Sequence, residues 1–295
     1  MVQNLNLNGH SNYKLSTYTY DNNVYVQKTC TTLGESERLK AQRDKQSDFL
    51  TFVRNDDVLQ CIFDVPEIVG ESTYDNKFSF YMEYRSGFNI IEYIAHTGSS
   101  HYIKLFQDIF RLIEKETDRC KNDDVEMDAI KNKLEDITTK VSDNEIKKYI
   151  QSFSKKISKK KITIPVGFCH GDLTFSNMIL SDKILLIDFL DDFINSPIQD
   201  ICKLLQSVNL QWELLISKSS DLDILKLNIA YKFLRNELKM GINQYLKKHK
   251  INKDALLILY TLTILRITPY VKSDDIMNAI KVELKRLEEK KCIHI

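Results

Sequence analysis

The chain has 295 residues, of which 43% are hydrophobic, so it can bury a large core or two lobes. Its 42 Lys and Arg residues nearly balance 41 Asp and Glu residues, and a net charge of +1 argues against a nucleic-acid partner. The six cysteines lack metal-ligand spacing and are expected to be free thiols. Residues 1–14 lack a signal-peptide core, and the longest apolar run, 255–265, is too short to span a bilayer. We therefore expect a cytoplasmic protein without a membrane span.

The first 84 residues favour a small lobe rich in strands. Apolar residues at 39, 49, 50 and 53 follow a helical period, and the Asp-Asn-Asn sequence at 21–23 is a good turn between two strands. The predicted order is strand, strand, helix, strand, strand, over residues 13–20, 24–28, 35–53, 61–69 and 77–84.

The remaining residues, 85–295, favour a larger and mainly helical lobe. Helices are predicted over 90–95 and 101–119, and the charge-rich segment 121–161 is expected to form one or two exposed helices. Four further helices are predicted at 199–217, 221–248, 253–268 and 273–291. The sequence therefore predicts an α+β protein with two domains, 1–84 and 85–295.

The most informative stretch is 169–189, which carries three polar side chains at characteristic spacing. Asp172 and Asn177 lie five residues apart, and Asp188 follows eleven residues later. Residues 181–183, Ser-Asp-Lys, separate two short apolar runs and predict a hairpin turn.

The pairing expected in this hairpin brings two oxygen ligands together. If Leu180 pairs with Ile184, the open end of the hairpin places Asn177 beside Asp188. Both offer hard oxygen atoms, which suit Mg²⁺ better than a soft metal. Asp172 would lie on the loop that leads into the hairpin and would face a substrate hydroxyl.

This stretch resembles the catalytic loop and metal-binding aspartate of protein-kinase-like phosphotransferases. Gly171 follows His170 where a protein kinase has Arg, which is similar to the aminoglycoside phosphotransferase and choline kinase group. The segment 196–201, Ser-Pro-Ile-Gln-Asp-Ile, is similar to the place where that group has a structural aspartate, here Asp200. The resemblance implies a two-lobed protein-kinase-like fold, with a small antiparallel-sheet N-lobe containing one helix and a larger helical C-lobe.

The resemblance also implies an activity and roles for these residues. The chain would move the γ-phosphate of ATP to a hydroxyl of a small molecule, with Mg²⁺ held by Asn177 and Asp188. Asp172 would be the catalytic base or the carboxylate that orients the hydroxyl. His170 would brace the loop, and Asp200 would anchor it from the following helix.

Lys28 is the expected phosphate-binding lysine. It shares one face of a strand with Val24 and Val26, so it points toward the cleft if the valines point inward. The glutamate that normally holds this lysine has no clear counterpart. The polar residues of the predicted helix are Glu35 and Glu37 near its start and Gln42, Asp44 and Gln46 further in.

The other nucleotide contacts are predicted from position. Ser11 lies in a polar segment one hairpin before Lys28, where the phosphate-covering loop is expected, and it could contact phosphate oxygens. Glu83 and Tyr84 end the last predicted strand of the N-lobe, where backbone groups of the hinge would read the adenine edge.

The acceptor is the least determined part of this interpretation. An amino alcohol such as choline or ethanolamine, or a sugar, ranks first, and Trp212, Tyr260 and Tyr270 could offer an aromatic face to a cation. An aminoglycoside is an alternative, although the C-terminal helices carry no dense acidic cluster. A protein kinase is disfavoured because Leu190 stands where Asp-Phe-Gly would need glycine. A nucleotide-binding pseudoenzyme is a further alternative.

Overall fold

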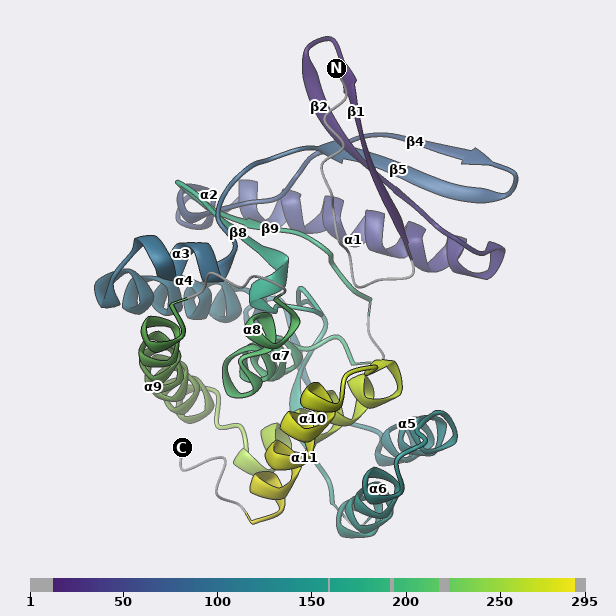
Figure 1. Cartoon of the computed structure of the whole chain (residues 1–295), viewed down its shortest axis with the longest axis vertical. Coiled ribbons are helices and arrows are strands. Elements are labelled where there is room, and N and C mark those ends of the chain that lie inside the picture. The colour runs from purple at the N-terminus through teal and green to yellow at the C-terminus, as the bar shows by residue number, and fades with distance from the viewer. Residues whose placement is uncertain (1–12, 159, 192–193, 218–222, 290–295) are drawn as a thin grey trace. The chain divides into compact units, whose positions relative to one another are not determined.

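The structure is a computed structural model that describes residues 13–158, 160–191, 194–217 and 223–289 (Figure 1). By internal packing it divides into two units. The sheet unit contains the described residues up to Ile90 together with those of Ser176–Phe193, and the helical unit contains those of Ile91–Phe175 and Ile194–Ile295. The functional division expected at residue 84 stays a prediction, because these units are defined by packing alone.

The sheet unit is built on a four-stranded antiparallel sheet with the order β1-β2-β5-β4. Its strands are β1 (Lys14–Tyr20), β2 (Asn23–Thr29), β4 (Ile68–Tyr74) and β5 (Lys77–Glu83). Two-residue turns join β1 to β2 and β4 to β5, and each turn has Asp followed by Asn with positive φ at both positions. These residues tolerate that conformation, which matches the twist of paired strands.

One long helix, α1 (Ser36–Arg54), follows the 3₁₀ turn η1 (Leu33–Glu35) and packs against the sheet (Figure 1). The core beneath the sheet contains Tyr13, Val26, Cys30, Leu39, Phe78, Phe80 and Met82. The expected order of two strands, one helix and two strands is confirmed. The bounds predicted for the third strand, 61–69, are wrong, because β4 spans Ile68–Tyr74. A short helix, α2 (Leu59–Ile62), occupies the start of that predicted range because Asp56 caps the N–H groups of Val58 and Leu59. Two residues, β3 (Phe63–Asp64), then form a short strand that pairs with β9 (Ile184–Leu186) before β4 begins.

The predicted hairpin also packs in the sheet unit. It consists of η2 (Phe175–Asn177), β8 (Met178–Leu180) and β9 (Ile184–Leu186), and β3 adds a parallel strand beside β9. Leu180 pairs with Ile184, so the predicted register is confirmed. After β9, Phe189 is buried against Phe49 of α1, with ring centroids 4.9 Å apart. The end of the hairpin is therefore fixed to the helix that covers the sheet.

The helical unit is organised around α7 (Pro197–Leu210), which contacts four other long helices. These are α4 (Ser99–Thr117), α9 (Ile224–Lys248), α10 (Lys253–Ile267) and α11 (Asp274–Glu288). The segment expected to be one or two exposed helices forms α5 (Met127–Lys140) and α6 (Asn144–Ile157), and each buries one apolar face. The remaining elements are α3 (Ile90–His96), α8 (Trp212–Ile216), η3 (Thr268–Tyr270) and the pair β6 (Lys121–Asp124) and β7 (Thr163–Val166).

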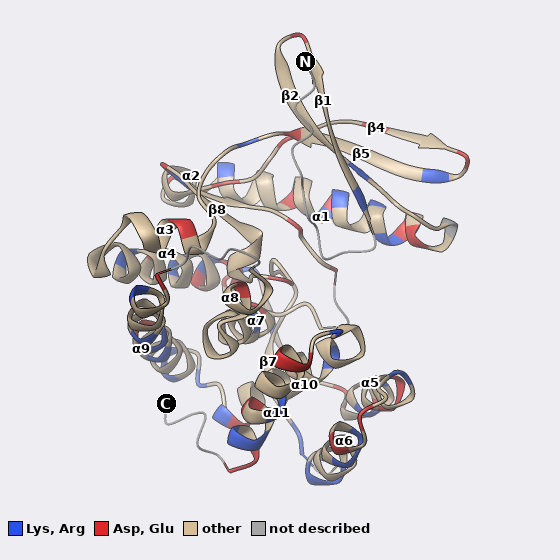
Figure 2. Cartoon of the chain, viewed as in Figure 1, with Lys and Arg blue, Asp and Glu red and all other residues tan. Residues whose placement is uncertain are grey.

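The sequence around α7 explains where this helix begins and ends. Ser196 caps it by accepting a hydrogen bond from the N–H of Ile198, and Pro197 suits the first turn. Gln211 has φ of +51°, which breaks the predicted 199–217 helix into α7 and α8. Most of α7 is apolar and buried, whereas charged residues are scattered along outer helices such as α6 and α9 (Figure 2). No helix in the described ranges combines the length and apolar character needed to cross a membrane.

Candidate active site

Lys28 is buried within the sheet unit and has two polar partners. Its side chain extends from β2 with only 3% of the residue exposed. Its Nζ donates to Oδ1 of Asp188 at 2.7 Å and to Oε1 of Gln42 at 2.9 Å. The ring of Tyr13 lies 5.0 Å from the same ammonium group. The strand, the helix and the hairpin of this unit therefore meet at one lysine.

The local fold explains why Lys28 turns inward. Val26, two residues earlier on the same face, belongs to the core, although Val24 at the strand edge is exposed. Gln42 lies on the buried face of α1, where it supplies an amide oxygen to the lysine. The sequence had left the partner of Lys28 open, and the structure places an uncharged amide there in addition to the aspartate.

The two predicted metal ligands lie at the open end of the hairpin. The backbone carbonyl of Asn177 accepts a hydrogen bond from the N–H of Ile187 at 3.1 Å, directly before Asp188. Asp188 has φ of +61°, a left-handed conformation that is uncommon outside glycine. Strained backbone of this kind is concentrated at functional sites, where surrounding structure holds it.

The character of these ligands fits a metal that takes few protein ligands. Asn177 is buried, whereas the Asp188 side chain remains 32% exposed while it contacts Lys28. Among the residues that the structure describes, no three His, Cys, Asp or Glu side chains cluster as a metal site. Mg²⁺ commonly binds through one or two side chains and completes its shell with phosphate oxygens and water. One carboxylate and one amide are therefore a suitable donor set for Mg²⁺ and a poor one for zinc.

The residues predicted to contact adenine and the phosphates have other partners or lie outside the described residues. The N–H of Glu83 donates to the carbonyl of Glu67 and that of Tyr84 donates to the carbonyl of Val24, both at 3.1 Å. These two N–H groups therefore serve the sheet itself. Ser11 lies outside the described residues.

Within the helical unit, a buried aspartate holds the loop that carries Asp172. Asp200 is fully buried, and its two oxygens accept the N–H groups of His170 and Gly171, each at 2.7 Å. Gly171 has φ of +89°, which explains why glycine rather than arginine follows the histidine. His170 is also fully buried, and its Nδ1 accepts the N–H of Asp172 at 3.2 Å. The histidine thus braces the loop, in agreement with its expected role.

The side chain of Asp172 forms an ion pair that the sequence had not suggested. Its Oδ1 lies 2.9 Å from Nζ of Lys203 on α7. One turn further, Oγ of Ser207 accepts the N–H of Phe175 at 3.1 Å and donates to Glu213. Asp200, Lys203 and Ser207 are spaced three and four residues apart, so one face of α7 holds the loop over 170–175. That spacing, counted forward from Asp200, is the signal that could have identified Lys203.

The aromatic residues considered for the acceptor lie in three different elements, and Trp212 is partly buried at the start of α8. Tyr260 is fully buried between helices, and its hydroxyl donates to Glu283 at 2.9 Å and accepts a hydrogen bond from Asn209. Tyr270 is largely exposed in η3. The buried ring of Tyr260 therefore serves helix packing.

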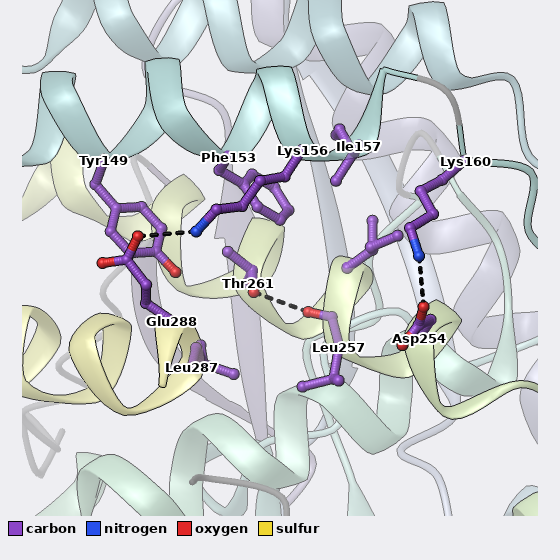
Figure 3. Close-up of a pocket in the computed structure, with 11 residues that line it drawn as sticks. Tyr149, Phe153, Lys156, Ile157, Lys160, Asp254, Leu257, Thr261, Leu287 and Glu288 are labelled. Atoms are coloured by element: carbon purple, nitrogen blue, oxygen red, sulfur yellow. Dashed lines mark hydrogen bonds and ion pairs between the residues drawn. The ribbon is translucent and has the colours of Figure 1, made fainter. Parts of the chain in front are cut away.

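A separate cavity of about 300 Å³ lies between α6, α10 and α11 (Figure 3). Its floor is apolar, and two ion pairs, Lys156 with Glu288 and Lys160 with Asp254, cross its rim. None of the predicted site residues lines it.

Comparison with known proteins identifies the fold. No protein-family model matches the sequence, and no curated protein sequence matches it either. Solved structures do match over nearly the whole chain. A thermostable mutant of the aminoglycoside phosphotransferase APH(4)-Ia matches with a TM-score of 0.61 and 9% identity, covering 98% of this chain and 94% of its own. Choline kinase LicA from Streptococcus pneumoniae matches with a TM-score of 0.56 and 15% identity, covering 98% and 94%.

A glucosamine kinase in complex with glucosamine, ADP and inorganic phosphate matches with a TM-score of 0.55 and 10% identity, covering 94% of this chain and 76% of its own. At these identities the likeness concerns the fold alone. The expected α+β fold of the protein-kinase-like phosphotransferases is thereby confirmed.

Proposed function

We propose that this protein transfers the γ-phosphoryl group of ATP to a hydroxyl group of a small molecule. The observation that carries the proposal is the contact between Lys28 and Asp188, residues 160 positions apart in the chain. A buried lysine paired with an aspartate in left-handed backbone is an expensive arrangement for stability alone. It is well suited to a site that handles phosphate and a divalent cation.

In the proposed site, Lys28 binds phosphate oxygens of the nucleotide, and Asn177 and Asp188 hold Mg²⁺. The bound ion would neutralise charge on the phosphates as the phosphoryl group moves. Asp188 can serve both partners because a carboxylate has two oxygens and about four acceptor positions. The N–H groups of Glu83 and Tyr84 are used in the sheet, so adenine recognition at the hinge falls to other groups near these residues.

Asp172 has the proposed role of positioning the acceptor hydroxyl and taking its proton. Phosphoryl transfer passes through a loose transition state, so catalysis depends mainly on orientation and charge. The loop contacts made by Asp200 and His170 support this role, because they fix the backbone on both sides of Gly171. These contacts keep the backbone at Asp172 in one place without a ligand.

The class of acceptor is proposed from chemistry and from the structural neighbours. Their names include kinases of choline and glucosamine and a phosphotransferase of aminoglycosides, which makes a small polar molecule with hydroxyl groups the favoured acceptor. An amino alcohol or a sugar remains our first proposal, and an aminoglycoside is the alternative. We also infer that the protein works in the reducing cytoplasm, on the basis of its composition.

The test is phosphate transfer from ATP to a panel of sugars, amino alcohols and aminoglycosides, followed by substitution of Asp172. Asp172→Asn preserves size and removes the base. Turnover should fall by about 10²-fold or more, because a positioned general base contributes about 10²–10⁴-fold. Nucleotide binding, measured by titration, should persist because Lys28, Asn177 and Asp188 are unchanged.

The matched control is Asp182→Asn, which changes an exposed aspartate in the hairpin turn. Normal turnover by Asp172→Asn would remove Asp172 from the catalytic role. Nucleotide binding without transfer to any acceptor would favour the pseudoenzyme alternative, and transfer only to protein hydroxyls would favour a protein kinase.

A further inference from the structure

The helix that holds the catalytic loop carries only two charged residues. Of the fourteen residues of α7, Asp200 and Lys203 alone are charged, and each contacts the loop of residues 170–172. Asp200 accepts hydrogen bonds from the loop backbone and so holds its shape. Lys203 instead contacts the side chain of Asp172. One turn further, Gln206 is buried, and its Oε1 has no hydrogen-bond partner within the described ranges. This side of α7 thus carries polar groups beyond those that hold the loop.

The ammonium group of Lys203 contacts Asp172, the carboxylate proposed to face the acceptor. Its side chain is 12% exposed and that of Asp172 is 23% exposed, so the pair is partly desolvated but still reachable. An exposed ion pair would have little energetic consequence, whereas a partly buried pair is screened much less. Asp172 therefore presents an acceptor with a carboxylate whose charge is already balanced.

We infer that Lys203 is a positioning and specificity-determining residue, which orients Asp172 and selects against acceptors that carry a positive charge beside the reacting hydroxyl. This inference rests on the proposed function and narrows its acceptor class. Neutral polyols and sugars, and hydroxy compounds with an anionic group, are the substrates that fit. Within the acceptor class proposed above, the inference therefore keeps the sugars and disfavours the amino alcohols, together with amino sugars.

Two effects of charge support this selection. A cationic group gains little from a carboxylate that already contacts an ammonium. It is also repelled by that ammonium. At about 6 Å, in surroundings between water and protein interior, the repulsion of two unit charges corresponds to a roughly 10- to 100-fold change in affinity. A neutral hydroxyl group experiences neither penalty and can still donate its proton to Asp172.

The orienting effect of Lys203 is separate from its effect on selectivity. A carboxylate that rotates freely spends only part of its time facing the acceptor, and the ion pair with Lys203 restricts that rotation. Loss of the ammonium should therefore lower kcat with neutral acceptors, rather than only raise KM. Loss of a residue with a purely structural role would lower the rates with charged and neutral acceptors alike and would leave the preference between them unchanged.

The experiment compares sugars that differ at one substituent, a hydroxyl group in glucose and galactose and an ammonium group in glucosamine and galactosamine. Choline and ethanolamine extend the cationic class. Rates of phosphate transfer are measured for the wild-type protein, Lys203→Met and Lys203→Arg. The matched control is Lys239→Met, which removes an exposed lysine of α9. Thermal unfolding of each variant checks that the fold survives.

We expect the wild-type protein to favour the neutral sugar of each pair by about tenfold or more in kcat/KM. Lys203→Met should lower kcat with the neutral sugar and shift the preference toward the amino sugar by about tenfold. Lys203→Arg should restore much of the original preference, and Lys239→Met should resemble the wild type. Transfer with an unchanged preference in Lys203→Met, or a wild-type preference for the cations, would overturn this inference alone. Absence of transfer to every acceptor would overturn the proposed function and the inference with it.

Discussion

Asp200 offers a test of the proposed catalytic loop that does not require the acceptor. Its fully buried carboxylate accepts two backbone hydrogen bonds of 2.7 Å, from His170 and Gly171. A hydrogen bond to a charged group contributes about 1.5–3 kcal/mol. Asp200→Ala would lose both bonds and leave two buried N–H groups without their acceptor, so we expect a loss of about 3–6 kcal/mol in the free energy of unfolding. That is a large part of the roughly 5–15 kcal/mol that holds a typical domain together.

Asp200→Asn separates the contribution of the charge from that of the shape. The amide keeps one acceptor oxygen, but its NH₂ group would face one of the two N–H donors. We therefore expect an intermediate loss of about 2–4 kcal/mol. Urea unfolding followed by circular dichroism gives both values, with Asp182→Ala in the exposed hairpin turn as the control. A loss below about 1 kcal/mol in Asp200→Ala would refute the reasoning, because a typical neutral hydrogen bond contributes that much.

Three further predictions concern other contacts, and each is checked by thermal or urea unfolding. Gln42→Leu should destabilise the protein by about 1–3 kcal/mol, because the buried Lys28 ammonium loses an acceptor, and Gln42→Glu should also destabilise it, because a second carboxylate adds an excess negative charge beside Asp188; wild-type stability of Gln42→Leu would contradict the role of Gln42. Gly171→Ala should cost about 1–3 kcal/mol because φ of +89° is strained for alanine, and an unchanged midpoint would argue against this conformation. Lys281 and the first N–H groups of α6 hold the pKa of Asp143 below its usual 3.8, so Asp143→Ala should destabilise the protein at pH 7 and progressively less as the pH falls below about 4.

Much of the fold was predictable because its signals are local. The turns at 21–22 and 75–76 use Asp and Asn, whose side chains favour the left-handed backbone that tight hairpins need. The charge-rich helices α5 and α6 retain an apolar residue on nearly every turn. The strand predicted at 61–69 failed because the capping side chain of Asp56 favoured a helical turn. Alternation of apolar residues alone does not reveal that competition.

The site was predictable to the extent that it depends on chain spacing. The hairpin register follows from the two apolar runs, and it brings Asn177 and Ile187 into contact as expected. Lys203 was missed because its partner Asp172 is 31 positions away, and pairing over that distance depends on how α7 packs. Gln42 was named only as one of several polar residues of the predicted helix and not as the partner of Lys28, since a glutamine in a helix usually faces water.

The charge balance around Lys28 explains why an amide, Gln42, and not a carboxylate contacts it from α1. Asp188 already supplies one negative charge at 2.7 Å, so the buried ammonium is neutralised before α1 contributes anything. A glutamate at position 42 would add a second negative charge to a site that excludes most water, and burying an excess charge is costly. The amide oxygen of Gln42 satisfies a further donor of the ammonium without that cost. If Asp188 binds a cation as proposed, a neutral partner on α1 would also leave Lys28 with its full attraction for phosphate. The absence of a glutamate opposite Lys28 among the described residues of α1 is thus consistent with the phosphate-binding role proposed for this lysine.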